Sequence, residues 1–280
     1  MNVSQAIFLG AVQGITEFFP VSSSGHLVFF QSLFGLKGDT LAFDIVVHWG
    51  TLLAVFIYFW KDIFALAKDT LLFSVRWPFK RNRAALFEAY PHALTGFFVM
   101  LTTVATGIMA FAFKEIFEFM FNSMLTVGGA WLVTGVCLIL SRRFQYGQRG
   151  LLEMNHQDAF MIGLIQGIAI MPGISRSGAT IMIAMYLGLE RESAARYSFF
   201  AAIPAILGAG VLEMNETISF YNANTPCFLT GLVVSAILGC AGIHFLLKIV
   251  RGEKYHYFGY YCLVMAAVAL SCSILRRFGV

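Results

Sequence analysis

Four long apolar segments of this chain contain no Asp, Glu, Lys or Arg, and they lie at residues 93–113, 119–141, 217–247 and 255–275. Each reaches the roughly 20 residues that a helix needs to cross the hydrocarbon core of a membrane. Two shorter segments, 45–60 and 197–212, also span if flanking side chains extend to the interface. Charged residues make up only 12% of the chain, against about 25% in soluble domains. The sequence therefore predicts an all-α integral membrane protein.

Basic residues are concentrated in a few connections between these segments. The largest group follows residue 60, and the positive-inside rule places it in the cytoplasm. Its members are Lys61, Lys68, Arg76, Lys80, Arg81 and Arg83. The same rule puts residues 142–149 and 251–254 on that side, whereas residues 213–226, which contain Glu but no Lys or Arg, are predicted to be external.

Counted from these anchors, the chain divides into two halves, each predicted to be a re-entrant helical hairpin with about three transmembrane helices. The first half, residues 1–150, has a hairpin at about 3–35 and spans at about 43–60, 93–113 and 119–141. The second half, residues 151–280, has a hairpin at about 159–189 and spans at about 197–212, 227–247 and 257–275. The first hairpin enters from outside and the second from the cytoplasm. We therefore expect an inverted-topology repeat within a single membrane domain, with the broken helices meeting near the midplane.

Both hairpins contain an apolar helix, a Pro break, a Ser/Gly loop and a second apolar helix. The residues that recur at equal spacing are Gly10, Gln13, Gly14, Ile15, Ser22, Ser24 and Gly25 in the first copy and Gly163, Gln166, Gly167, Ile168, Ser175, Ser177 and Gly178 in the second. Pro20 and Pro172 are expected to end the first helix of each pair. Glu17 and His26 occur only in the first copy, and Arg176 stands where that copy has Ser23. One pattern with different polar groups predicts a single site built from two halves.

The two loops carry groups that suit phosphate. Residues 22–24 are expected to cap the helix that begins near His26, and the second loop repeats the arrangement. Two helix N-termini that face one point offer free N–H groups and favour anions. Arg176 adds a planar guanidinium that fits phosphate bidentately. Gln13 and Glu17, four residues apart, share a helix face beside this point.

Several of these groups have a structural alternative. A Ser/Gly loop after Pro can be a helix break that allows close packing. His26 follows Glu17 across the turn and is either functional or a satisfied packing residue. Glu17 and Arg176 either serve the reaction or form a structural ion pair. Asp44 and His48 share a helix face and either line the site entrance or lie at the membrane interface.

Residues 13–26 resemble the signature E/Q-x-x-x-E followed by P-V-S-S-S/T-G-H of bacterial undecaprenyl-diphosphate phosphatases of the bacitracin-resistance (BacA-like) family. Residues 172–180 resemble that family's second signature, P-G-x-S-R-S-x-x-T. Spacing, chain length and hydropathy agree from end to end, so the resemblance covers nearly the whole chain. Gln13 stands where many members carry Glu.

The resemblance implies hydrolysis of undecaprenyl (C55) diphosphate at the outer face of the bacterial cytoplasmic membrane, which recycles the lipid carrier for cell-wall synthesis and confers bacitracin resistance. It also implies a divalent cation, Mg²⁺ or Ca²⁺, which Glu17 and Gln13 would orient. The expected phosphate-binding residues are Ser22, Ser24, Gly25, Ser175, Ser177, Gly178 and Thr180. The expected catalytic residues are Glu17, Ser23, His26 and Arg176.

Ser23 is the expected nucleophile, with His26 as its base or as the acid for the leaving oxygen. Their spacing of three residues predicts a hydrogen bond between them. Direct attack by His26 and attack by water both stay open as alternatives.

The alternative function is a secondary transporter or a polyprenyl-phosphate flippase, because transporters are commonly built from inverted repeats with broken helices. A non-catalytic lipid-binding or channel protein is a third interpretation. The expected partners are the polyprenyl diphosphate and membrane lipids, and no nucleic acid. The sequence leaves open the tail-length preference, the physiological metal, lipid flipping and the oligomeric state, with a homodimer among the choices.

Overall fold

The computed structural model of the chain describes residues 1–36, 40–79, 83–121, 123–143, 147–252 and 254–277. Regular structure in these residues is helical, apart from an isolated β-bridge between Arg149 and Leu189. The predicted all-α fold is therefore confirmed. Two members of the basic group after residue 60, Lys80 and Arg81, lie outside the described residues.

Within the described residues, six helices are long and apolar enough to cross a membrane. They are α3 (Thr40–Tyr58), α6 (Ala93–Ala112), α8 (Met124–Leu140), α11 (Arg191–Leu212), α12 (Met214–Arg251) and α13 (Tyr257–Arg277). Their outer faces expose large apolar side chains, such as Ile108 and Phe111 on α6, which suit lipid rather than water. The chain is a multi-pass membrane protein. The opposite orientation of its two halves stays a prediction.

Two of these helices differ in extent from the expected spans. A separate helix, α7 (Lys114–Phe121), precedes α8, because Ser123 starts a new helix by accepting a hydrogen bond from the Thr126 amide. The α12 helix begins well before the expected residue 227, so that most of the segment predicted to be external is helical. Asn224 has a non-helical backbone and divides α12 just before Pro226, a usual cause of a kink.

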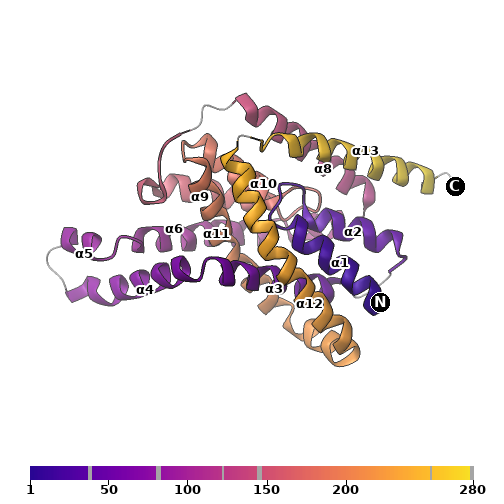
Figure 1. Cartoon of the computed structure of the whole chain (residues 1–280), viewed down its shortest axis with the longest axis horizontal. Coiled ribbons are helices and arrows are strands. Elements are labelled where there is room, and N and C mark those ends of the chain that lie inside the picture. Colours follow the sequence, from indigo (N-terminus) through magenta and orange to yellow (C-terminus); the bar gives the residue numbers. More distant parts are fainter. Residues whose placement is uncertain (37–39, 80–82, 122, 144–146, 253, 278–280) are drawn as a thin grey trace.

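Two shorter helices, α4 (Trp60–Arg76) and α5 (Arg83–Ala89), connect α3 to α6. Phe73, Leu86 and Tyr90 form a small apolar cluster that joins them to the start of α6. Figure 1 shows α4 beside α6 at the left of the view, and α8 beside α13 along the top. Single 3-10 turns occupy Trp77–Phe79, Ser141–Arg143 and Leu151–Glu153.

The two hairpins are the pair α1 (Val3–Thr16) and α2 (Ser23–Leu33) and the pair α9 (His156–Ile168) and α10 (Arg176–Tyr186). In both, the first helix ends four residues before the Pro of the loop. A Pro ring clashes with the carbonyl four residues back and cannot donate to it, so Pro20 ends α1 and Pro172 ends α9 at these positions.

The recurring glycines are packing positions. Helix α1 packs against α12, and α9 packs against α6. A Cβ atom on Gly14 would lie 2.8 Å from the carbonyl oxygen of Ser235, and one on Gly163 would lie 2.6 Å from that of Thr102. Each hairpin is thus seated on a long helix of the other half of the chain by backbone approaches that only glycine permits.

Candidate active site

The two Ser/Gly loops meet in the interior of the protein. The Gly173 amide of the second loop donates to Ser22 Oγ of the first at 2.9 Å. In the other direction, Ser177 Oγ donates to the Phe19 carbonyl at 3.0 Å. The prediction that one site is assembled from both halves therefore holds for the position of the loops.

Each loop ends in the same helix cap. Ser22 Oγ accepts the Gly25 amide at 3.3 Å, and Ser175 Oγ accepts the Gly178 amide at 3.0 Å. The two serines thus cap α2 and α10 as the sequence predicts. Because the Gly25 and Gly178 amides are engaged in these caps, the free N–H groups at the two helix ends belong to the residues just before them.

The first loop is strained at Ser22. Among the described residues, Ser22 is the one non-glycine residue with positive φ, at 65°. Such a conformation costs on the order of 1–3 kcal/mol, and it persists only where the surroundings fix it. In the second loop the left-handed residue is Gly173, with φ of 98°, and glycine adopts this conformation freely.

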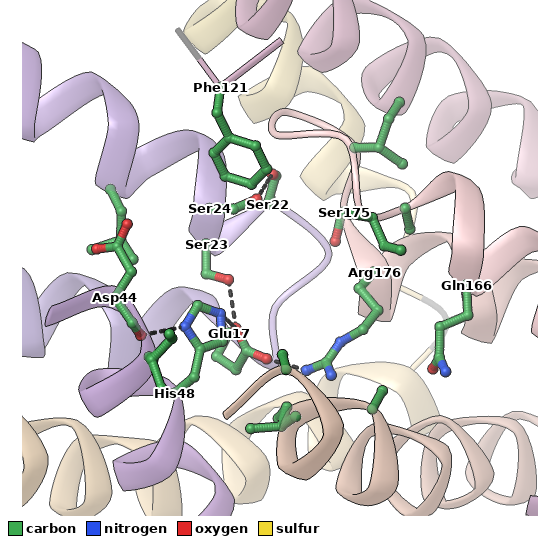
Figure 2. A pocket seen from close by; sticks show the side chains of 18 of the residues that line it. Glu17, Ser22, Ser23, Ser24, Asp44, His48, Phe121, Gln166, Ser175 and Arg176 are labelled. Carbon is green, nitrogen blue, oxygen red and sulfur yellow. Dashed lines mark hydrogen bonds and ion pairs between the residues drawn. The ribbon is translucent and has the colours of Figure 1, made fainter. Parts of the chain in front are cut away.

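Glu17 is the centre of the site. Its Oε2 atom accepts hydrogen bonds from Ser23 Oγ and from Gln13 Nε2, and its Oε1 atom pairs with Nη2 of Arg176. His48 Nε2 lies 3.5 Å from Oε2. Figure 2 shows Glu17 between His48 and Arg176, with Ser23 above it. A buried carboxylate at membrane depth is costly unless paired, and here the partner Arg176 comes from the other hairpin.

A cavity of about 260 Å³ lies beside this cluster. Its polar end is formed by Glu17, Ser23, His48 and Arg176. Apolar side chains from α3, α11 and the second loop form most of its other walls, among them Ile45, Ile170, Ile174, Ala205, Ile206 and Ala209. A pocket that joins a polar end to apolar walls fits an amphipathic ligand.

About half of the predicted site residues line this cavity. Those in its wall are Glu17, Ser22, Ser23, Ser24, Ser175 and Arg176. Those placed behind the wall are Gln13, Gly25, His26, Ser177, Gly178 and Thr180. Thr180 shows what this second set does, because its hydroxyl bonds Ser198 of α11 at 2.6 Å and the Arg176 carbonyl at 2.8 Å. It fixes the start of α10, which carries Arg176.

The prediction of a hydrogen bond between Ser23 and His26 is wrong. Ser23 donates to Glu17 instead. The imidazole of His26 turns away from the cavity, with Nδ1 2.7 Å from the Ser22 carbonyl and Nε2 2.7 Å from the Tyr261 hydroxyl. The reason is local: a residue at the fourth position of α2 lies over the preceding turn, where the Ser22 carbonyl is its nearest acceptor.

His48 is the histidine that reaches the cavity. The sequence left Asp44 and His48 undecided between the site and the interface, and both lie in the cavity wall. His48 Nδ1 is 2.6 Å from the Asp44 carbonyl, so Nδ1 carries a hydrogen and Nε2 faces Glu17. Gln31 of α2 donates to the Asp44 carboxylate at 2.6 Å. The sequence feature that could have predicted this placement is the i, i+4 spacing of Asp44 and His48 on an apolar span.

Gln166 also lines the cavity, although it was noted only as the counterpart of Gln13. Its Nε2 atom donates to Thr106 at 3.1 Å, and its buried Oε1 atom has no hydrogen-bond partner among the described residues. Gln166 lies beyond Arg176 when seen from Glu17 (Figure 2).

The cavity wall offers a cation the carboxylates of Glu17 and Asp44 rather than a complete cage of ligands. Within the described residues, no three His, Cys, Asp or Glu side chains are placed to hold a metal ion together. Next to Glu17, the Oε1 atom of Gln13 is buried without a hydrogen-bond partner. Mg²⁺ usually binds through one or two carboxylates together with substrate phosphates. These residues therefore fit an ion that is held jointly with a phosphate ligand.

Comparison with known proteins gives a consistent result over the whole chain. The profile of the family described as "Bacitracin resistance protein BacA" matches residues 6–268. The undecaprenyl-diphosphatase of Methanosphaera stadtmanae is 39% identical over 280 residues, which cover 98% of this chain and 99% of the relative. The undecaprenyl-diphosphatase of Carboxydothermus hydrogenoformans is 38% identical, with 99% and 100% covered. That of Halothermothrix orenii is 37% identical, with 96% and 98% covered.

Proposed function

Because this chain belongs to the BacA family of bacitracin resistance proteins, we propose that it hydrolyses undecaprenyl diphosphate to undecaprenyl phosphate and inorganic phosphate. The observation that carries the proposal is the meeting of Glu17, Ser23 and Arg176 at the polar end of a cavity with apolar walls. The polar end suits a diphosphate, and the walls suit the start of a prenyl chain. A cavity of about 260 Å³ is far too small for the whole lipid, so most of the tail remains in the membrane.

Ser23 is the nucleophile in this mechanism. Its hydroxyl donates to Glu17 Oε2, which takes the proton as Ser23 Oγ bonds to the terminal phosphorus. The bond from that phosphorus to the bridging oxygen breaks, and the lipid phosphate leaves. Water then hydrolyses the phosphoserine and releases inorganic phosphate. Ser23 is favoured over His26 because His26 lies behind the cavity wall with both ring nitrogens engaged.

Arg176 and the loop amides hold the phosphates. Phosphoryl transfer depends on positioning and on charge stabilisation at the equatorial oxygens. The pairing with Glu17 uses only Nη2 of Arg176, which leaves donors on the other guanidinium nitrogens for phosphate oxygens. The same ion pair orients the guanidinium before a ligand arrives.

A divalent cation, Mg²⁺ or Ca²⁺, belongs to the proposal as well. Glu17, with Gln13 beside it, would hold the ion, which when bound neutralises part of the phosphate charge. We also propose that the first hairpin, and with it the site, faces the outer side of the cytoplasmic membrane, which the charge pattern of the loops supports.

Phosphate release from a purified polyprenyl diphosphate in detergent tests the function. We expect release by the wild type, loss of release in Arg176→Ala, and inhibition by a chelator that added Mg²⁺ reverses. Absence of release by the wild type at any metal concentration would contradict the phosphatase. Movement of labelled lipid across vesicle membranes without hydrolysis would favour the transporter alternative.

A further inference from the structure

His26 and Tyr261 join the first loop to the last helix of the chain. The two rings stack with 5.7 Å between centroids and 8° between planes, and the hydroxyl of Tyr261 meets His26 Nε2. Trp131 of α8 closes another side of the imidazole edge-on, at 5.1 Å. His26 is 2% exposed and is absent from the cavity wall. Its surroundings are therefore two aromatic rings and a backbone carbonyl, not the phosphate site.

The acceptors around His26 fix where its hydrogen lies. The Ser22 carbonyl can only accept, so Nδ1 of His26 must donate to it. In the neutral imidazole Nε2 is then an acceptor, and the Tyr261 hydroxyl donates to it. The Ser22 carbonyl thus sets the tautomer, and Tyr261 holds the orientation of the ring, as outer partners do for histidines that bind metals.

Side chains outside the loop hold two consecutive carbonyls directly before Ser23. His26 donates to the carbonyl of Ser22, and Trp131 Nε1 donates to that of Val21 at 2.8 Å. Ser22 is also the strained residue of the loop, with φ of 65°. Rotation of Ser22 to an ordinary conformation would break its contact with the second loop and turn Ser23 away from Glu17.

We propose that Tyr261 and His26 are positioning residues for the phosphoryl transfer. Tyr261 donates to His26, and His26 holds Ser22 in its left-handed conformation, so that Ser23 Oγ points at Glu17. The inference rests on the proposed function of Ser23 as nucleophile. It gives His26 no proton transfer to the substrate, and it assigns an effect on turnover to Tyr261, which lies on α13 outside the cavity wall.

Four variants test the pair. His26→Asn keeps an N–H donor near the position of Nδ1, whereas His26→Ala removes it. Tyr261→Phe removes only the hydroxyl, and Tyr260→Phe makes the same change at the next residue, which is half exposed. For each variant, kcat and KM are measured over a range of pH with a lipid diphosphate in detergent.

We expect His26→Asn to recover at least about tenfold in kcat over His26→Ala and to keep the shape of the wild-type pH profile. Tyr261→Phe should lower kcat by about three- to tenfold, the effect of one hydrogen bond, with KM nearly unchanged. Tyr260→Phe should match the wild type. Loss of one limb of the pH profile in His26→Asn, or wild-type kcat in Tyr261→Phe, would overturn the proposal.

Nitrogen NMR shifts of His26, assigned by their loss in His26→Asn, test the pair without any turnover. We expect a protonated Nδ1 and an unprotonated Nε2 in the wild type, and a change of both shifts in Tyr261→Phe. The opposite tautomer would refute the pair even in an active enzyme. If the wild type releases no phosphate, the proposed function fails, while these shifts still decide whether the pair exists.

Discussion

The two loops at the centre of the molecule share a backbone plan and differ in charge and in strain. In each, the first helix ends four residues before a Pro, and a Ser caps the second helix. The first loop carries Glu17 and Ser23, and the second places Arg176 at the position of Ser23. The first loop takes its left-handed turn at Ser22, the second at Gly173, where the conformation is free of strain.

This difference indicates that the loop carrying Ser23, the proposed nucleophile, is held in a strained conformation, whereas the loop carrying Arg176 is relaxed. Ser22 is fixed by His26 from within its own hairpin and by Gly173 from the other loop. The second loop is also held by hydrogen bonds from outside it, because Thr134 donates to the Gly173 carbonyl at 2.9 Å and Tyr255 donates to the Gly178 carbonyl at 3.0 Å.

The largest difference between the two hairpins is expected in the side of the membrane from which a thiol reagent can label them. Ser4 and Gln157 are exposed at matching positions in the first turns of α1 and α9. In a background without the five native cysteines, Ser4→Cys should react with an impermeant thiol reagent on intact cells. Gln157→Cys should react only after the membrane is opened. Labelling of both from one side would refute the inverted repeat.

The next largest effect separates the two loops by chemistry. Ser23→Ala removes the proposed nucleophile, and we expect kcat to fall about a thousandfold or more. Ser177→Ala, in the second loop, loses the hydrogen bonds of its hydroxyl with the Phe19 carbonyl and Ser175 Oγ, and it should retain at least roughly a tenth of wild-type turnover. Steady-state phosphate release measures both. Similar losses in the two variants would mean that Ser23 has a structural role.

A smaller loss of activity is expected when the side chain at position 176 keeps its positive charge but loses the planar shape of the guanidinium. Arg176→Lys retains a cation but loses the guanidinium fork, so kcat/KM should fall by about ten- to several-hundredfold, at roughly 1.4 kcal/mol for each tenfold. Arg149→Lys is the control, because Arg149 binds Asp158 and backbone carbonyls away from the cavity. It should lower the unfolding temperature and leave turnover per folded molecule unchanged. Near-normal turnover in Arg176→Lys would exclude bidentate phosphate binding.

The smallest effect concerns the packing of the two hairpins against their partner helices. Gly→Ala changes at matching positions should destabilise both hairpins to a similar extent. Gly14→Ala and Gly163→Ala each place a methyl group against a carbonyl of the partner helix, and we expect a loss of about 1–3 kcal/mol of stability. Gly129→Ala on α8 meets no atom within 4 Å and should be neutral or slightly stabilising. Thermal unfolding in detergent compares the three. A loss in only one of the first two would show that the hairpins are seated differently.

Features that depend on neighbouring residues could be predicted from the sequence. Long segments without charged residues predicted the membrane spans. The clash of a Pro ring with the carbonyl four residues earlier explains where α1 and α9 end. The caps at Ser22 and Ser175 also follow from local pattern, and so could the engagement of the Gly25 and Gly178 amides, since an N-cap serine normally bonds the amide three residues on.

Features that depend on how distant helices pack could not be predicted. His26 meets Tyr261, which lies 235 residues further along the chain on an apolar helix. No spacing rule connects two such positions, and the shorter separation between His26 and Ser23 suggested a partnership that the geometry does not contain. His48 reaches Glu17 for a similar reason, because the rotation of α3 about its axis is set by its packing against α12 and α11.

The hydrogen bonds that join the loops also limit how the molecule can move. Alternating access requires one half of a transporter to rock against the other around a central site. In this chain such rocking would separate Gly173 from Ser22 and Ser177 from Phe19, and it would carry Arg176 away from Glu17. The contacts that assemble the site therefore also join the two halves, together with the packing of α1 on α12 and of α9 on α6. While these contacts are in place, as hydrolysis requires, the halves cannot rock to open a path across the bilayer. Hydrolysis and transport could therefore occur only one after the other.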